Sequence, residues 1–247
     1  MPLSARFKSV PWGVLSIEFV VVVVGILGAL WVDSWREERT DRGLETRYLT
    51  RLHQDLKASR ETLIEVIDRH ESTAGDLRSA LEELRTRSGP AGIEVLRETL
   101  GSATDLSVYT PEHSTYEEMV ATGNLGLIRD DSVRIALSRY DRWLQRNSEL
   151  DALAVNQEFL TLEPVLWDYF VPTDLVPPEF EAWPVTDSPF PLDPASLYGN
   201  RRLWNVLNSR LETEMACVTF RGELLAALNS AIALVERELE VRGQLAY

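Results

Sequence analysis

The chain has 247 residues, with 39 acidic and 25 basic side chains, a formal net charge of −14 and 45% apolar residues. The acidic balance makes nucleic acid and anionic lipid surfaces poor partners, and the single cysteine, Cys217, excludes an intrachain disulfide framework. The apolar content predicts that most of the chain is folded.

We expect a mainly α protein with one N-terminal transmembrane helix and an elongated, bundle-like extramembrane helical domain. An irregular excursion rich in proline and aromatic residues interrupts that domain. The predicted segments are a short tail at 1–9, a transmembrane anchor at 10–34, a helical domain at 35–163, the acidic Pro- and aromatic-rich segment at 164–200, and a C-terminal helix at 201–247 that packs on the helical domain.

The first predicted element is the transmembrane helix. Residues 10–32 contain one ionisable side chain, Glu18. The uncharged run 19–32 covers only about 21 Å of helix, less than a hydrocarbon layer of about 30 Å, so the span must include Glu18. Trp12 and Trp31 would then lie at the two membrane interfaces. A cleaved signal peptide is the alternative, but the apolar run is too long for one and no A-x-A-like site follows.

Glu18 lies near the middle of this span, where a carboxylate that faces lipid is costly. At about 100° per residue, Glu18 shares one helix face with Val22, Gly25 and Ala29. Small residues four apart let two helix backbones approach closely. This stripe therefore predicts a contact with another transmembrane helix, either of a different protein or of a second copy in a homodimer. The alternative is a Glu18 that is protonated, or reaches toward the interface, and contacts no protein.

The orientation of the anchor depends on the charges that flank it. Counting positive charges alone would place the large domain inside, because five arginines follow the span. A short basic tail before the first span usually stays in the cytoplasm, and large domains are translocated largely regardless of charge. We therefore expect a single-pass protein of the bacterial inner membrane, with a cytoplasmic N-terminus and a periplasmic main domain.

Long helices are predicted to follow the anchor. The apolar positions recur at intervals of three, four and seven residues, typical of helices that bury one face: Leu44, Tyr48, Leu52, Leu56, Leu63, Ile67, Leu77, Leu81 and Leu84. No proline lies between Pro11 and Pro90, so the anchor helix is expected to continue to about Ser88. A shorter helix is predicted over residues 93–100.

The segment 114–160 carries the clearest helix boundaries. Ser114 or Thr115, with glutamates three residues on, predicts a capping box, and Gly123 or Asn124 predicts a left-handed helix end. Asp130 or Asp131 is expected to cap the next helix, which continues past residue 160. This is a helix-turn-helix only in the generic sense, and we expect no reading of DNA from so acidic a chain.

Eight of the twelve prolines fall between residues 164 and 194, among six aromatic side chains. The prolines predict an irregular segment, and the aromatics predict that it is ordered, packed on the helices or docked on a partner. The candidate docking residues are Trp167, Tyr169, Phe170, Phe180, Trp183 and Phe190. Residues 147–200 hold ten acidic and no basic side chains, so a basic partner surface or bound cations would suit them, although a solvated face is the default.

The last predicted helix runs from about Asn200 to Val241. Its predicted buried face is formed by Leu203, Leu207, Leu211, Leu224, Leu228, Ala231 and Val235. Cys217 is expected to be a small core residue rather than a nucleophile.

No catalytic or cofactor motif accompanies these helices. The three histidines occur in no recognised metal-ligand spacing, and the chain contains no phosphate-binding glycine loop and no G-x-S-x-G motif. We therefore expect no enzyme activity, no cofactor and no metal.

Two stretches resemble an uncharacterised bacterial family of single-span proteins, a domain of unknown function. One comprises Glu18, the Gly25-Ile26-Leu27 and Ala29-Leu30 segments, Trp35 and residues 37–39, followed by YLTRLHQDL. The other is STYEEMVATGNLGLIRDDSVRIALSRY. The resemblance covers about a quarter of the chain and implies a membrane anchor with a helical domain, but no activity.

Two non-enzymatic functions fit these expectations. The first is an accessory or structural subunit that stabilises or assembles a larger integral-membrane complex, respiratory or photosynthetic, with other membrane subunits and the lipid bilayer as partners. The second is a periplasmic sensor or ligand-binding module that signals through a separate membrane partner, because the short N-terminal tail cannot form an output domain.

Overall fold

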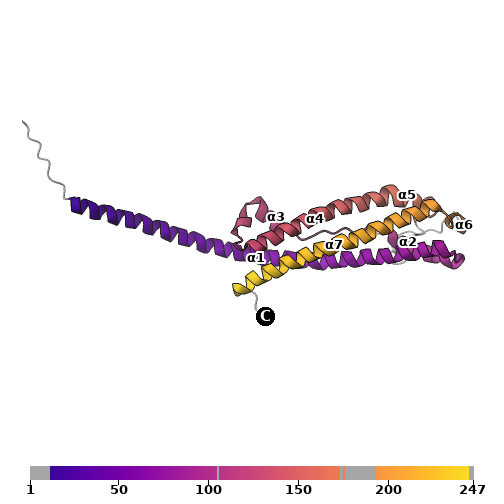
Figure 1. The fold of residues 1–247 in the computed structure, drawn as a ribbon, viewed down its shortest axis with the longest axis horizontal. Helices are drawn as coiled ribbons and strands as arrows, with labels where there is room; N and C mark the ends of the chain where they lie inside the picture. Colours follow the sequence, from indigo (N-terminus) through magenta and orange to yellow (C-terminus); the bar gives the residue numbers. More distant parts are fainter. Residues whose placement is uncertain (1–11, 105, 173–174, 176–192, 245–247) are drawn as a thin grey trace, which may run out of the picture. The chain divides into compact units, whose positions relative to one another are not determined.

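All regular structure in the described part of the chain is helical (Figure 1). The computed structural model describes residues 12–104, 106–172, 175 and 193–244. None of these residues forms a β-strand, which confirms the prediction of a mainly α chain. Internal contacts divide the chain into two units, Met1–Tyr48 and Leu49–Tyr247, and helix α1 (Trp12–Thr86) contributes to both.

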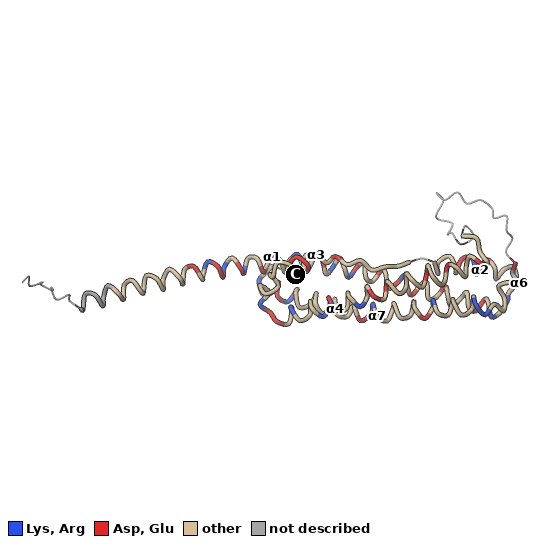
Figure 2. The backbone as a smooth tube through the Cα atoms, turned by 90° about the horizontal axis from the view of Figure 1, so that it is seen from above, with Lys and Arg blue, Asp and Glu red and all other residues tan. Residues whose placement is uncertain are grey.

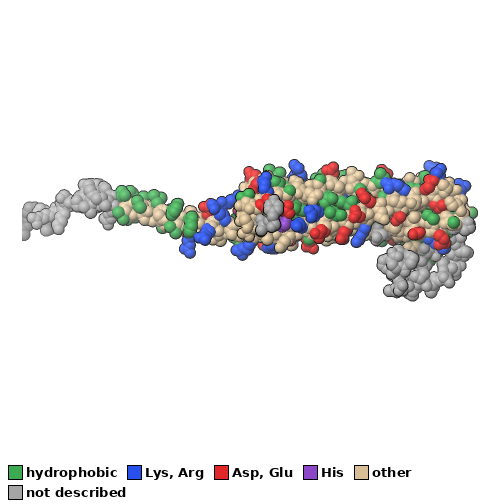
Figure 3. All heavy atoms as spheres, turned by 90° about the horizontal axis from the view of Figure 1, so that it is seen from below, with side chains coloured by type: hydrophobic (Ala, Val, Ile, Leu, Met, Phe, Trp, Pro, Cys, Tyr) green, Lys and Arg blue, Asp and Glu red, His purple; other side chains and the backbone are tan. Residues whose placement is uncertain are grey.

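The described part of the first unit is the N-terminal part of α1. Its residues 19–32 carry no charge, and hydrophobic side chains cover the surface of this stretch (Figure 3). After this uncharged stretch, acidic and basic residues follow from Asp33 onward along the helix (Figure 2). The helix is continuous here because residues 12–86 contain no proline, as predicted.

The second unit is built on three long helices: the remainder of α1, α4 (Asp131–Gln157) and α7 (Arg201–Val241). Helix α7 runs antiparallel to both of the others, because residues that come later in α7 pair with residues that come earlier in α1 or α4 (Figure 1). The pairs that fix this direction are His53 with Glu236 and His70 with Glu214 for α1, and Asp130 with Arg237 and Asp151 with Arg221 for α4.

The buried positions of the three helices follow a regular alternation of three and four residues, the spacing of coiled-coil seams. On α1 this series comprises Leu49, Leu52, Leu56, Ser59, Leu63, Val66, His70, Thr73, Leu77, Ala80 and Leu84, and Glu45, Ala74, Leu81 and Glu83 are buried in addition. On α4 they include Val133, Leu137, Tyr140, Asn147, Asp151 and Ala154, and on α7 Leu203, Leu207, Arg210, Glu214, Cys217, Arg221, Leu224, Leu228, Ala231 and Val235. The three seams thus mix apolar layers with polar ones.

Short elements complete the unit. They are α2 (Pro90–Ala103), α3 (Ser114–Ala121), the 3₁₀ turn η1 (Asn124–Leu127), the π-helical turn η2 (Glu158–Leu162), α5 (Glu163–Leu166) and α6 (Pro194–Leu197). The turn η2 and α5 prolong α4 without a break, as the prediction of a helix past residue 160 requires. Leucines of α2 enter one apolar cluster with the C-terminal end of α1 and the start of α7, which closes this end of the bundle.

The helix boundaries test the local sequence patterns. Gly123 has φ 74° and ends α3, and the carboxylate of Asp130 accepts a hydrogen bond from a backbone N–H of the first turn of α4, both as predicted. The predicted capping box is wrong, because His113 occupies the N-cap position of α3 and its side chain makes no capping bond. The N–H of Thr115 instead donates to Asp55 of α1, 3.1 Å away. A residue of another helix has replaced the local cap.

Candidate functional site

The predicted membrane residues lie on a part of α1 that buries nothing within this chain. Val22 and Ala29 are exposed, Trp31 is 70% exposed, and the space beside Gly25 is open. Glu18 lies in α1, but its side chain, like that of Trp12, is outside the described part of the structure. By length and composition α1 can cross a membrane; α7 passes the same test, but α7 is the core helix of the bundle.

The predicted docking aromatics divide into three groups. Phe170 is only 2% exposed and packs in the apolar cluster with α1 and α2, so it is a core residue and is not available to a partner. Tyr169 is partly buried and accepts a hydrogen bond from the side chain of Asn200. Trp167 is exposed. Phe180, Trp183 and Phe190 lie outside the described residues.

A cluster of charged and polar side chains inside the bundle was not predicted. Its members come from all three long helices and from η2, and each is buried: His70, Asn147, Asp151, Glu158, Arg210, Glu214 and Arg221. We call this set the interior polar network. Charged side chains of this kind are almost never fully buried unless they are paired, so their partners decide what the network does.

Arg221 forms the centre of one half of the network. Its side chain is completely buried, and it donates hydrogen bonds to Asp151 and, over 3.4 Å, to the backbone oxygen of Ser107. The other carboxylate oxygen of Asp151 accepts a bond of 2.9 Å from Asn147. Burial raises the pKa of the Asp151 carboxyl, and the positive charge of Arg221 opposes this rise. Among the groups that favour the ionised carboxylate, the guanidinium of Arg221 has the largest effect.

His70 joins this half to the other. Its Nδ1 lies 2.5 Å from Glu214, an acceptor, and its Nε2 lies 2.5 Å from Arg221, a donor. Nε2 also lies 3.0 Å from the backbone oxygen of Ser107, so the ring contacts an acidic side chain, a basic side chain and a backbone carbonyl. On the far side, the guanidinium of Arg210 lies 2.9 Å from Glu214 and 3.6 Å from Glu158. Charge thus alternates along a chain of contacts from Asp151 to Glu158.

This arrangement favours a structural role for the network over a catalytic one. Its ionisable members are almost entirely removed from solvent, so no substrate has access to them in this conformation. A buried polar layer in a coiled-coil seam selects one register and one helix orientation, because any shift leaves charges without partners. Here it links α7 to both antiparallel neighbours. Cys217 lies on the same seam, and burial raises the pKa of its thiol, which fits a core residue.

The sequence did contain a signal for the network. The seam of α7 continues without a change of spacing through Arg210, Glu214, Cys217 and Arg221, between the predicted Leu207 and Leu224. Polar residues at these positions interrupt the apolar pattern but keep its period. The predicted buried face contained Leu211 instead of the adjacent Arg210, and Leu211 is only partly buried.

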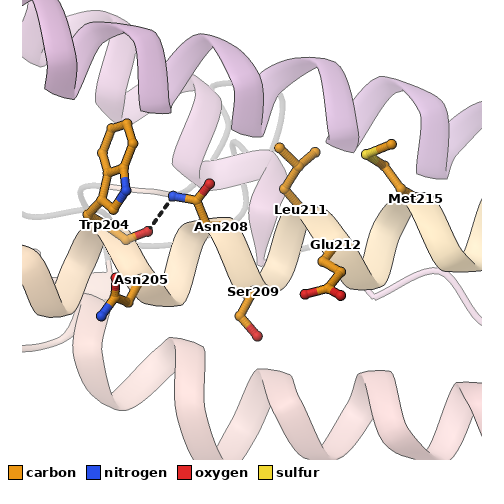
Figure 4. A pocket seen from close by; sticks show the side chains of 7 residues that line it. All are labelled: Trp204, Asn205, Asn208, Ser209, Leu211, Glu212 and Met215. Atoms are coloured by element: carbon orange, nitrogen blue, oxygen red, sulfur yellow. Dashed lines mark hydrogen bonds between the residues drawn. The ribbon is translucent and has the colours of Figure 1, made fainter.

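Helix α7 carries an open groove on its surface (Figure 4). All of its lining residues come from this one helix: Trp204, Asn205, Asn208, Ser209, Leu211, Glu212 and Met215. In Figure 4 Trp204, Leu211 and Met215 project from one side of the helix, whereas Asn205, Ser209 and Glu212 project from the other. Glu212 is the single ionisable residue among them, so the groove offers no pair of catalytic groups and no enclosed ligand cavity.

The part of the chain that the structure describes holds no group of three or more His, Cys, Asp or Glu side chains placed to bind a metal ion. No curated protein and no solved structure matches the chain. The model of a family of unknown function, DUF6090, matches residues 18–157, from the apolar stretch of α1 to the end of α4. The interior polar network therefore lies partly inside the match and partly, through Glu158 of η2 and the residues of α7, beyond it. The match covers more than half of the sequence, and the chain belongs to the family of unknown function DUF6090.

Proposed function

We propose that this protein is a non-enzymatic, single-pass accessory subunit that stabilises or assembles a larger integral-membrane complex. The N-terminal part of α1 would cross the membrane with its N-terminus in the cytoplasm, and the helical unit 49–247 would lie in the periplasm. The observation that carries the proposal is the apolar stretch 19–32, which is exposed along its length within this chain. Such a surface is stable only when lipid or another protein covers it.

The outside of the helical unit supports association with other proteins. Large apolar side chains are exposed on α4, η2 and α7: Ile135, Leu153, Phe159, Leu160, Met215 and Phe220. A ligand-binding sensor would instead favour an enclosed cavity, and the groove on α7 is an open surface. The accessory role is therefore preferred to the sensor role. A respiratory or photosynthetic host is proposed only because such assemblies often carry single-span subunits.

The test is extraction of the tagged full-length protein from its native membranes with a mild detergent, followed by native-gel mass and identification of co-migrating chains. We expect a stoichiometric band that contains other membrane proteins. Replacing Gly25 with Ile, or Glu18 with Leu, on the predicted packing stripe should weaken this band. The matched change Val24→Ile, about 100° away on the helix, should leave it intact. A protein that migrates as a lone monomer or homodimer would favour the sensor function instead.

The orientation has its own test. In a Cys217→Ser background, a cysteine placed at the exposed position Asn205 on α7 provides a single accessible thiol. A membrane-impermeant maleimide should label this thiol in spheroplasts without lysis. Labelling only after lysis would place the helical unit in the cytoplasm and overturn the proposed topology.

A further inference from the structure

The first four turns of α1 beyond its apolar stretch separate positive from negative charge. This segment, residues 33–47, contains four arginines and five acidic residues, which nearly cancel in sum. Placed at about 100° per residue and measured from Gly25, the arginines fall between about −100° and +40° and the acidic residues between about 80° and 220°. The arginines are Arg36, Arg39, Arg42 and Arg47, and the acids are Asp33, Glu37, Glu38, Asp41 and Glu45. We call the first set the basic face.

The basic face is solvent-exposed and mostly unpaired. Arg42, at its edge, forms an ion pair of 2.6 Å with Glu38 on the neighbouring turn. Arg39 lies over the ring of Trp35, 5.6 Å from its centre. Arg36, Arg39 and Arg47 make no ion pair with a carboxylate of the described residues. Three guanidinium groups therefore remain able to bind acidic groups of another molecule.

The basic face lies on the same side of α1 as the small residues Gly25 and Ala29 of the apolar stretch. On the same angular scale Gly25 lies at about 0° and Ala29 at about 40°, while Arg36 lies at about 20° and Arg47 at about 40°. Supercoiling would shift these positions by about 20° per heptad, which accumulates to about 60° between Gly25 and Arg47 and is still less than the roughly 140° width of the face. A helix that packs beside Gly25 and Ala29 would hence meet the arginines when both helices leave the membrane.

We propose that the basic face docks on a neighbouring membrane-spanning helix of a different chain, one that carries carboxylates in its first turns outside the membrane. This inference rests on the proposed function, since only a membrane-spanning subunit presents this face to such a neighbour. It identifies the partner's chemistry: an apolar helix with room for close packing, followed by acidic residues on the same face.

A second copy of this chain does not fit this surface. All copies of a single-pass protein insert in one direction, so two copies joined through this face run parallel and bring equivalent residues together. Arg36 would then face Arg36, and Arg47 would face Arg47, and like charges at these positions repel. The basic face thus selects against the homodimer that the small-residue stripe alone would permit.

Lipid phosphates do not fit the whole surface either. Counted from Val32 at about 1.5 Å per residue, Arg36 lies about 6 Å beyond the apolar stretch and Arg47 about 22 Å beyond it. The headgroup layer of a bilayer is about 5–8 Å deep on each side. Phosphates can reach Arg36, but Arg47 requires a partner that extends well outside the membrane, as a helix does.

Carbodiimide cross-linking tests this contact directly. The variant R36K/R39K/R47K keeps the charges and supplies amines, which a carbodiimide joins to carboxylates that touch them. The variant is introduced into the full-length protein, membranes are treated with the reagent, and the linked peptides are identified by mass spectrometry. The control variant E37K carries its amine on the acidic side of the helix, about 100° from Arg36. We expect links from positions 36, 39 or 47 to Asp or Glu of one membrane-spanning partner, and none from position 37.

Charge reversal provides the quantitative test. The variant R36E/R39E/R47E should retain about tenfold less partner than the wild type, as expected from the loss of three exposed charge pairs, and raised salt should weaken the wild-type association. The control D33K/E37K reverses charges on the other face and should retain the partner.

The other outcomes separate this inference from the proposed function. Links between two copies of this chain, or no links while the complex still co-purifies, would overturn the acidic-helix contact and leave the accessory role intact. Reduced binding to phosphatidylglycerol vesicles with unchanged partner yield would assign the face to lipid. If no complex is recovered from the wild type, the proposed function itself fails.

Discussion

Replacing Arg221 with Met should strongly destabilise the helical unit. Arg221 is completely buried, and it is the main positive partner of Asp151, which is also buried. Methionine roughly preserves the length of the side chain but leaves the carboxylate inside the bundle without a counter-charge. Breaking a buried pair in this way costs about 3–5 kcal/mol. The expected loss is a large share of a domain stability of about 5–15 kcal/mol.

The loss should depend on pH, and its sign follows from Asp151. Burial already raises the pKa of this carboxyl, and removal of Arg221 raises it further. A carboxyl whose folded-state pKa lies above its unfolded value favours folding when protonated, and this contribution is lost as pH rises through the folded pKa. The free energy of unfolding of the variant should therefore be closer to that of the wild type at about pH 5 than at about pH 7, because Asp151 takes up a proton at the lower pH.

The assay is urea unfolding of the full-length protein in non-ionic detergent, followed by far-UV circular dichroism. Urea leaves the charges unscreened, unlike guanidinium chloride. The control is Arg202→Met, which removes an exposed pair with Asp168 at 2.7 Å and should cost less than about 1 kcal/mol. Adding Asp151→Asn to Arg221→Met should recover part of the loss. An Arg221→Met protein as stable as the control, or equally destabilised at both pH values, would refute the assigned role of the network.

Two further predictions concern local structure. Asp130→Ala should cost about 1–2 kcal/mol in the same urea assay, because its carboxylate caps α4. The bonds from Ser132 lower the pKa of Asp130 to about 2. The stabilisation by the ionised carboxylate should therefore be complete above the ordinary pKa of an aspartate and disappear as pH falls toward about 2. A stability difference between Asp130→Ala and the wild type that does not shrink on acidification would contradict the cap. Gly101→Ala should destabilise by about 1–3 kcal/mol, because the added Cβ would lie 2.5 Å from the backbone oxygen of Leu175. Gly75→Ala, in open space within α1, should stabilise by up to about 1 kcal/mol, and equal effects of the two changes would show that the close contact at Gly101 is wrong.

Local signals in the sequence determined the helices of this protein and most of their ends. The absence of proline from residues 12–86, the left-handed Gly123 and the cap at Asp130 each act within a few residues, so they can be read without knowledge of the fold. The charge separation around residues 33–47 is equally local, because helical geometry alone sets which residues share a face. The apolar run 19–32 likewise needs only its own composition to predict a membrane helix.

Only the tertiary structure decided what lies between the helices. It placed Asp55 at the start of α3 in place of the predicted capping box, put Phe170 in the core, and brought Arg221 to Asp151 and His70 from two other helices. The sequence shows that Arg210, Glu214 and Arg221 keep the period of a buried seam. Arg210 and Glu214 form an ion pair within α7, whereas the carboxylate that pairs with Arg221 belongs to Asp151 of α4. The reason is physical: burial of a charge is tolerated only beside an opposite charge, and that opposite charge is supplied by a distant segment whose position depends on the packing of the whole bundle.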